Sequence, residues 1–324
     1  MILLNLLVMT MILFFLNLIR LMKTNRFFAI AMVAATVLAC QKENAANENV
    51  NELAFTTSIQ QPEAQTKATL EDGLKVAFQV NDKIRATEWT ITNKKDCKCT
   101  TAGVNAVFSF NSGLKADAEG FYAVYKYQAT VPEGSGLLQI CNLGKGAKKE
   151  GLQYELEAQS IVYPIQTAVL NSFDPNSLGM VGKSGSDWNL KFCQMNSLLK
   201  FELKKDGVSK VVLESLATAD TDPVNIAGRY SMQCLDEDKD NWFDKFYPGM
   251  SADGESPTIT ILPPSGQTTF PQGVYYIVTR AARNCEGGLK LSFYDGETEL
   301  KSFSNTSKVQ LNRGKVRNLG SFTW

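Results

Sequence analysis

The thiol of Cys40 stands directly behind a segment built like an export signal. This segment opens with the basic residues Lys23 and Arg26, continues through the apolar residues 27–38, and ends on the small residue Ala39. A signal peptide has these three parts in this order, with an apolar core of roughly 7–15 residues. The pattern therefore predicts a signal peptide over residues 22–39 and export of a mature chain that begins with a cysteine.

The four residues 37–40 (VLAC) resemble the lipobox of bacterial lipoproteins, in which the cysteine receives a diacylglycerol and becomes the mature N-terminus. We expect Cys40 to hold the protein on lipid at the outer membrane and cell surface. Residues 40–51 are polar and without an apolar period, which is typical of a flexible tether. Residues 1–21 are interpreted as upstream sequence translated by mistake, because the three signal regions fall in order only from Met22.

An acidic run places carboxylates at alternate positions, as calcium-binding loops do. These carboxylates belong to Asp236, Asp238 and Asp240. An EF-hand loop also requires a glycine at its sixth position and a glutamate at its twelfth, and this chain has neither there. The run is therefore either a weak calcium ligand or a solvated hairpin tip. The neighbouring Trp242 either stacks on a sugar or packs against the protein.

Histidine is absent from the sequence. This excludes Ser–His–Asp and Cys–His catalysis and every histidine-ligated metal site. Of the 33 basic residues, three precede Cys40, so 30 remain against 33 acidic residues in the mature chain. That balance gives no electrostatic footprint for nucleic acid. We therefore expect no enzyme, no catalytic residues, no cofactor, no metal centre and no nucleic-acid partner.

Six cysteines follow Cys40 at wide spacing. They are Cys97, Cys99, Cys141, Cys193, Cys234 and Cys285. In an exported protein they form disulfides or remain as buried free thiols, and the sequence leaves both open. On a strand, Cys97 and Cys99 share one face and Lys98 takes the other. A metal at this pair lacks further ligands nearby.

Beyond the tether, short β-rich runs alternate with turn signals and no helix is indicated. Leu53–Ile59, Thr258–Leu262 and residues 315–323 are such runs, and Asp295-Gly296 is such a turn. Many short strands at this spacing predict an all-β protein of antiparallel sandwiches. Gly, Pro and Ser crowd into residues 173–187, which predicts a junction between an N-terminal domain, 52–180, and a C-terminal domain, 186–324.

Lys67 follows the first predicted strand within a polar linker. An exposed linker is accessible to a trypsin-like protease, so Lys67 is a candidate cleavage site. The alternative is a solvated surface lysine.

Six motifs occur in a fixed order along the mature chain. They are residues 66–69 (TKAT), 80–84 (VNDKI), 196–201 (NSLLKF), 259–264 (ITILPP), 273–278 (GVYYIV) and 313–320 (RGKVRNLG). Together they resemble fimbrillin-like proteins, exported lipoproteins of Bacteroides-type Gram-negative bacteria that include the subunits of type V pili. The resemblance implies two tandem transthyretin-like antiparallel β-sandwich domains.

The resemblance also implies a route of assembly. In polymerising members, a protease cuts after a basic residue and releases the first strand, and the next subunit donates a strand into the open groove. On this sequence Lys67 would be the cut site and Leu53–Ile59 the displaced strand. The implied partners are other pilus subunits and a host or microbial surface glycan or protein.

Two features depart from the family pattern. Many members carry arginine where this chain has Lys67, so an arginine-selective protease would leave it uncut. The chain also stops at Trp324, directly after the last predicted strand, which favours a tip or accessory subunit over a stalk subunit. The alternative function is a non-polymerising glycan-binding surface lipoprotein that uses aromatic residues such as Trp89, Trp188 or Trp242.

Overall fold

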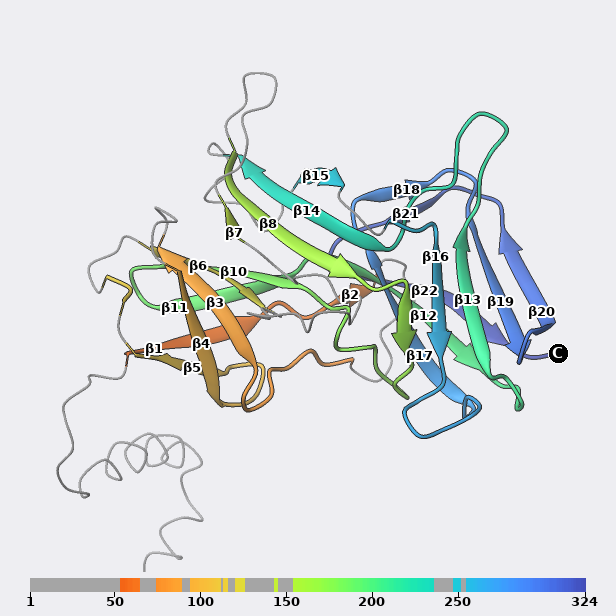
Figure 1. The fold of residues 1–324 in the computed structure, drawn as a ribbon, viewed down its shortest axis with the longest axis horizontal. Coiled ribbons are helices and arrows are strands. Elements are labelled where there is room, and N and C mark those ends of the chain that lie inside the picture. Colours follow the sequence, from red (N-terminus) through yellow and green to blue (C-terminus); the bar gives the residue numbers. More distant parts are fainter. Residues whose placement is uncertain are drawn as a thin grey trace, which may run out of the picture. The chain divides into compact units, whose positions relative to one another are not determined.

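The computed structural model of the chain describes residues 53–64, 74–88, 94–111, 113–115, 120–125, 143–144, 154–235, 247–251 and 255–324. These residues belong to one compact unit, 51–324. Every regular element in the described ranges is a β-strand, which confirms the all-β prediction (Figure 1). No helix in these ranges is long and apolar enough to cross a membrane.

Seven strands form a sheet that closes on itself, and we call it the closed sheet (Figure 1). In order around this sheet they are β1 (Leu53–Ile59), β11 (Asn189–Gln194), β10 (Met180–Gly185), β6 (Gly120–Tyr125), β3 (Lys83–Glu88), β4 (Lys94–Thr101) and β5 (Val107–Phe110). All pairs are antiparallel except β1 with β11, which run parallel. Closure leaves no free strand edge, so every strand has two neighbours.

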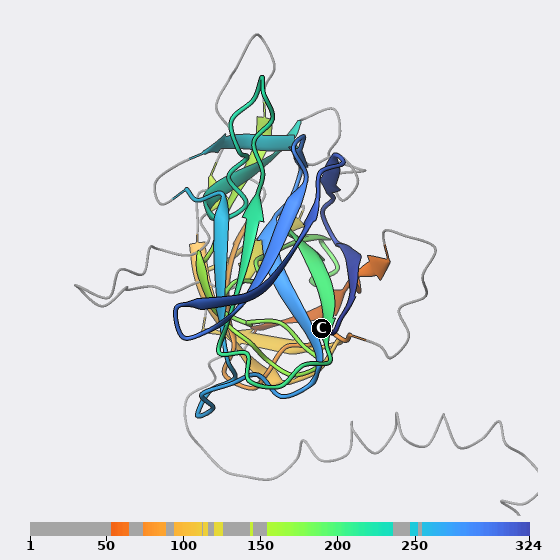
Figure 2. The same ribbon diagram turned by 90° about the vertical axis from the view of Figure 1, so that its right-hand side faces the viewer.

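The C-terminal part contains two sheets, seen from the C-terminal side in Figure 2. The four-stranded sheet has the order β17 (Gly273–Arg280), β12 (Asn196–Leu203), β22 (Lys315–Phe322) and β2 (Glu63–Ala64). The five-stranded sheet has the order β20 (Thr298–Asn305), β19 (Leu289–Asp295), β13 (Lys210–Ser215), β16 (Thr258–Leu262) and β9 (Ile165–Thr167). Phe293 of β19 lies 6.3 Å from Phe201 and 5.2 Å from Phe322 between ring centroids, so the two sheets pack face to face.

Two smaller sheets complete the described fold. One has the order β15 (Tyr247–Ser251), β14 (Gly228–Leu235), β8 (Tyr154–Val162) and β7 (Leu143–Gly144). The other pairs β18 (Arg283–Cys285) with β21 (Val309–Leu311).

Alternation of apolar and polar residues explains why these segments become strands. In β13 the buried positions are Val211, Leu213 and Ser215, and the residues between them are half-buried. This period of two points one face of the strand into the core. β12 is buried along most of its length, as expected for a strand with neighbours on both sides.

The stretch rich in Gly, Pro and Ser, residues 173–187, contains β10, which pairs with β6 and β11 in the closed sheet. Gly182 is required there because a Cβ atom would lie 2.9 Å from the ring of Phe192. The closed sheet continues to Gln194, and β12 of the four-stranded sheet begins at Asn196. The division into domains 52–180 and 186–324 and their transthyretin-like sandwich form stay predictions.

Candidate functional site

The strand predicted to be displaced, β1, has the predicted bounds Leu53–Ile59 and lies between β5 and β11 in the closed sheet. Thr56 pairs with Val107 on the β5 side and with Asn189 on the β11 side. At the end of the strand the Gln60 amide donates to the Phe192 carbonyl at 2.8 Å. Since β1 is bonded on both edges, its removal would leave two neighbouring strands with unpaired backbone groups.

Phe55 is the main anchor of β1. Its side chain is fully buried, and its ring centroid lies 5.2 Å from Phe110, 5.1 Å from Phe121 and 5.0 Å from Trp188. These separations are typical of favourable aromatic pairs. The ring therefore fills a site whose walls are other aromatic side chains.

Thr57 and Ile59, the next two inward residues of β1 after Phe55, also hold the strand in the closed sheet. The hydroxyl of Thr57 donates to the Ala106 carbonyl at 3.1 Å and accepts from the Ala106 amide at 3.1 Å. Ile59 is buried at the end of the strand. The inward pattern is therefore a large aromatic residue, a small hydroxyl residue and a β-branched residue at every second position.

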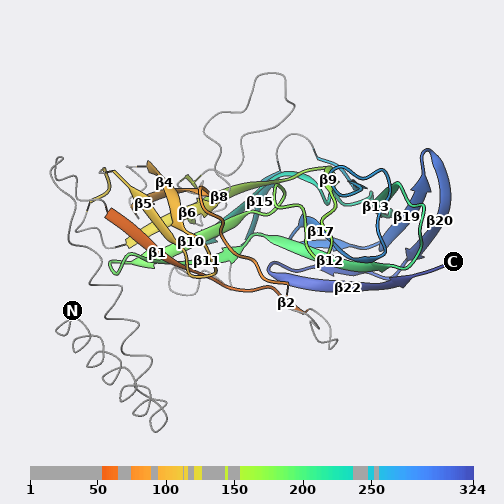
Figure 3. The same cartoon turned by 90° about the horizontal axis from the view of Figure 1, so that it is seen from below.

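The chain after β1 is fastened at two more points. The amide group of Gln61 donates to the Val76 carbonyl at 3.0 Å and accepts from the Val76 amide at 2.9 Å, as a paired strand would. Two residues further on, β2 pairs in parallel with Lys315 and Val316 of β22 (Figure 3). Segment 53–64 thus contacts both the closed sheet and the four-stranded sheet.

The other candidate site residues lie outside the described residues. These are Cys40, Lys67, Asp236, Asp238, Asp240, Trp242 and also Trp89. Lys67 follows the last residue of β2, Ala64, by three positions. Lipidation, cleavage and calcium or sugar binding at these residues stay predictions.

Trp188 is half-buried, and its ring packs against aromatic side chains of the closed sheet instead of standing free as a sugar platform. Besides its contact with Phe55, its centroid lies 5.7 Å from Phe110 and 4.4 Å from Phe121. Its φ of 57° places it in the turn between β10 and β11. The sequence suggested a ligand role because tryptophan binds sugars, but the turn directs this ring inward.

The four described cysteines, Cys97, Cys99, Cys193 and Cys285, are buried and form no disulfide with one another. Cys97 and Cys99 face inward while Lys98 is exposed, as the alternation predicted. Burial raises the pKa of the Cys97 thiol to about 12, and it also raises the pKa of Cys99. Because the thiolate is the reactive form, these thiols are suited to packing and not to chemistry.

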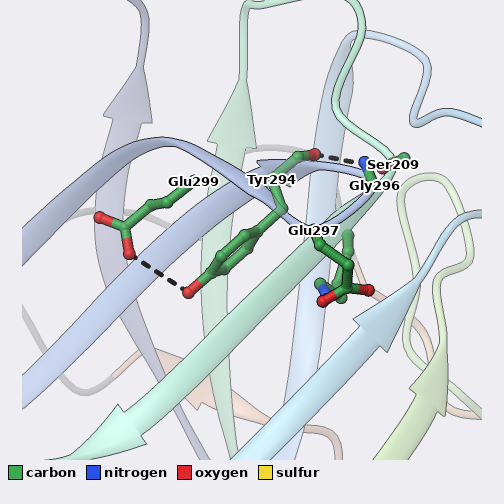
Figure 4. Close-up of polar contacts among 6 residues, drawn as sticks. Ser209, Tyr294, Gly296, Glu297 and Glu299 are labelled. Carbon is green, nitrogen blue, oxygen red and sulfur yellow. Dashed lines mark hydrogen bonds and ion pairs between the residues drawn. The ribbon is translucent and has the colours of Figure 1, made fainter.

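Polar side chains also gather at the hairpin between β19 and β20, where the sequence indicated the turn Asp295-Gly296 (Figure 4). The amide of Gly296 donates to the Ser209 hydroxyl at 2.7 Å, and the Tyr294 hydroxyl donates to Glu299 at 3.2 Å. Lys210 pairs with Glu297 at 2.9 Å and lies 4.8 Å from the Tyr294 ring. These groups bond to one another, so the cluster stabilises a turn.

The sequence did not indicate which strands flank β1. Phe110 and Phe108 stand on alternate positions of β5, and this alternation was visible in the sequence. Pairing of β1 with β5 and with β11 is a long-range property that no local pattern contains.

Neither protein-family models nor curated proteins match the chain. The solved structures that match it include cell adhesion and fimbrial proteins of Bacteroides and Parabacteroides. A "putative cell adhesion protein" from Bacteroides ovatus ATCC 8483 is 9% identical over 83% of this chain and 92% of that chain, with a TM-score of 0.44. Another from Bacteroides uniformis ATCC 8492 is 12% identical over 85% and 94%, with a TM-score of 0.42. A fimbrial assembly protein from Parabacteroides distasonis ATCC 8503 is 11% identical over 83% and 91%, with a TM-score of 0.33. At these identities and scores the likenesses establish neither the fold nor the function of this chain.

Proposed function

We propose that the chain is a non-enzymatic, fimbrillin-like surface lipoprotein that serves as a structural or adhesive pilus subunit and assembles by donor-strand exchange. The observation that carries the proposal is the position of β1. This strand lies near the start of the mature chain, closes an otherwise complete sheet, and is separated from Lys67 by seven residues. Release of β1 would turn the closed sheet into an open one.

The released groove sets requirements on the strand that replaces β1. Its backbone must bond to β5 and β11, which supplies affinity whatever its sequence. Its side chains must fill the places of Phe55, Thr57 and Ile59, which supplies register and specificity. A donated strand therefore needs an aromatic residue followed, four positions later, by a β-branched one.

Anchoring and polymerisation are alternatives for one molecule under this proposal. Lipid on Cys40 holds the intact chain at the outer membrane, and the link runs through the tether and β1. Cleavage after Lys67 would leave residues 40–67 with the lipid and free the remaining body. Whether that body only accepts a strand or also donates one depends on its position in the pilus, which we expect to be at the tip or in an accessory place.

The test is digestion of the purified mature lipoprotein with a lysine-specific protease, followed by SDS gel electrophoresis without boiling. We expect a cut after Lys67, identified by mass spectrometry, and then SDS-resistant ladders. The Lys67→Ala chain should remain monomeric, whereas the control Lys75→Ala, at an exposed lysine, should polymerise like the parent chain. If the parent chain is cut after Lys67 and then neither forms ladders nor binds a peptide that copies β1, the strand-exchange proposal is wrong.

A short peptide separates groove formation from polymerisation. The peptide LAFTTSI, which copies β1, should bind the cleaved chain and suppress the ladders by occupying the groove. A peptide with Phe55→Ala should suppress them far more weakly, because it leaves the aromatic site empty. Equal suppression by both peptides would show that β1 does not define the groove.

A further inference from the structure

A pocket of about 550 Å³ lies on the outward face of the four-stranded sheet, and no residue of β1 lines it. Lys200 and Glu202 of β12 form its base, Tyr276 of β17 lies on one side and Asn318 and Ser321 of β22 on the other, with Asn171 at the rim. Pockets of roughly 300–1,000 Å³ hold small ligands. None of these residues was singled out as a site by the sequence.

Strand alternation brings the pocket residues to one face. Along β12, Leu199, Phe201 and Leu203 point to the core, so Lys200 and Glu202 point outward. Lys200 pairs with Tyr276 on one side and with Asn318 on the other. Neighbours across strands are close, so three strands contribute polar groups to one small area.

A β-bulge in β22 adjusts the site further. The register between β12 and β22 shifts between Lys200 and Glu202, so that Glu202 lies opposite Ser321. Gly320 supplies the left-handed backbone, with φ of 104°, that the shift requires. As a result the Ser321 hydroxyl donates to the Glu202 carboxylate. Bulges commonly re-aim side chains in this way next to binding sites.

The rim of the pocket is fixed to the sheet by backbone bonds. Asn171, in the left-handed conformation with φ of 58°, donates its amide to the Val274 carbonyl at 2.8 Å. The Tyr276 amide donates to the Ser172 carbonyl at 3.2 Å. These bonds tie the rim loop to β17, so the pocket is formed before a ligand arrives, which limits the entropy cost of binding.

The polar groups of the pocket combine donors and an acceptor. Glu202 accepts from Ser321 and lies 3.3 Å from the ammonium group of Lys204. Within the described ranges the Lys200 ammonium has no ion pair or hydrogen bond. The side-chain oxygen of Asn318 accepts from the Gly320 amide, which leaves its NH₂ group to donate.

We propose that this pocket binds a short neutral glycan. Sugar hydroxyls both donate and accept, so adjacent hydroxyls match the donors Lys200 and Asn318 and the acceptor Glu202. The half-buried Val274 supplies the apolar edge against which the C–H face of a sugar packs, and Tyr276, which is 6% exposed, lines the pocket beside it.

The charge balance selects against other ligands. An anion bound at Lys200 would lie beside the Glu202 carboxylate, and a cation at Glu202 would lie beside two ammonium groups. An amino-acid zwitterion would need Glu202 to pair with its ammonium group, but Glu202 already has Lys204 and Ser321 as partners. An uncharged ligand avoids both conflicts.

The glycan site does not depend on strand exchange. The strands that line it, β12, β17 and β22, lie outside segment 53–64, and no residue of that segment lines the pocket. Binding is therefore measured on the intact, uncleaved monomer. Glycan binding by the intact chain tests this inference alone, and strand exchange after cleavage tests the assembly proposal alone, so the failure of one is distinguishable from the failure of the other.

The experiment screens the intact mature chain on an array of neutral, sialylated and sulfated glycans, and then measures affinity for the best neutral oligosaccharide by calorimetry. We expect neutral glycans to bind and their charged derivatives to bind more weakly. Lys200→Met, which keeps the aliphatic stem, should weaken binding roughly 10- to 100-fold because a charged hydrogen-bond donor is lost. Lys301→Met, at an exposed lysine of β20, is the matched control and should bind like the parent chain.

A second variant, Asn318→Ala at an exposed position, keeps the test valid if Lys200→Met unfolds. It should also weaken binding, with the circular dichroism spectrum unchanged. The inference is overturned if no neutral glycan binds more tightly than about 1 mM. It is also overturned if only anionic glycans bind, or if both pocket variants bind like the Lys301→Met control. If glycan binding is lost in Trp242→Ala and in neither pocket variant, the binding site lies at the acidic run and not in this pocket.

Discussion

Phe55→Ala should strongly destabilise the closed sheet of the intact chain. Full burial of a phenylalanine side chain contributes about 1.5–3 kcal/mol. The cavity left by the ring raises the expected loss in the free energy of unfolding to about 3–5 kcal/mol. Phe55 falls in this range because it is fully buried and faces three aromatic rings at centroid separations of 5.0–5.2 Å, which a small residue cannot contact.

The measurement is urea unfolding followed by tryptophan fluorescence, since Trp188 packs against Phe55. Hydrogen exchange of the β5 and β11 amides then shows whether these two strands are the ones that lose stability. With a slope near 2 kcal/mol per molar, the midpoint should fall by roughly 1.5–2.5 M urea.

Leu300→Ala is the control, because Leu300 is 36% exposed on β20 and its truncation should cost below about 1 kcal/mol. If Phe55→Ala costs no more than this control, or if exchange rises in β20 and not in β5 and β11, then β1 does not close the sheet and the reasoning fails.

Three further outcomes follow from single contacts. Gln61→Ala should lower the free energy of unfolding by about 1–3 kcal/mol and raise the hydrogen-exchange rate of the Val76 amide, which loses its acceptor. An unchanged exchange rate at Val76 would contradict this. The Cys97 thiol, with a pKa of about 12, stays protonated at pH 8 and should resist a maleimide in the native chain but react in urea; native labelling at that position would refute its burial. The pKa of Glu202 lies below its ordinary value chiefly because Ser321 donates to it, so Ser321→Ala should raise that pKa in an NMR titration, and a fall would contradict the assignment.

Sequence reasoning located strands best where burial alternates cleanly. β1 and β16 have the predicted bounds, because one face of each packs into a core and the apolar residues recur at every second position. In β4 the sequence indicated only the alternation of Cys97, Lys98 and Cys99 and not the bounds of the strand, Lys94–Thr101. Its inward face carries only Cys97 and Cys99, which suffice inside a closed sheet but make a weak signal.

The glycine-rich stretch shows a second limit. The sequence counted Gly182 among the residues that predict a domain junction, and the structure gives this glycine a packing role in β10, where the Phe192 ring occupies the space of a Cβ atom. Conversely, residues 75–80 look like a strand, yet only Phe78 forms a bridge there. Phe78 exchanges two backbone hydrogen bonds with Gly103, and Val76 bonds to the side chain of Gln61, which no local pattern could predict.

The attachments of segment 53–64 differ in strength, and this difference determines which of them limits strand release. β2 pairs through two residues only, and Gln61 contributes two hydrogen bonds to Val76. β1, in contrast, is bonded along both edges and buries Phe55 and Ile59. After a cut following Lys67, the C-terminal end of the segment can therefore detach first at low cost, while β1 leaves last. Under the proposed assembly the groove would open only when Phe55 withdraws, so the aromatic site and not the protease would set the rate at which subunits exchange strands.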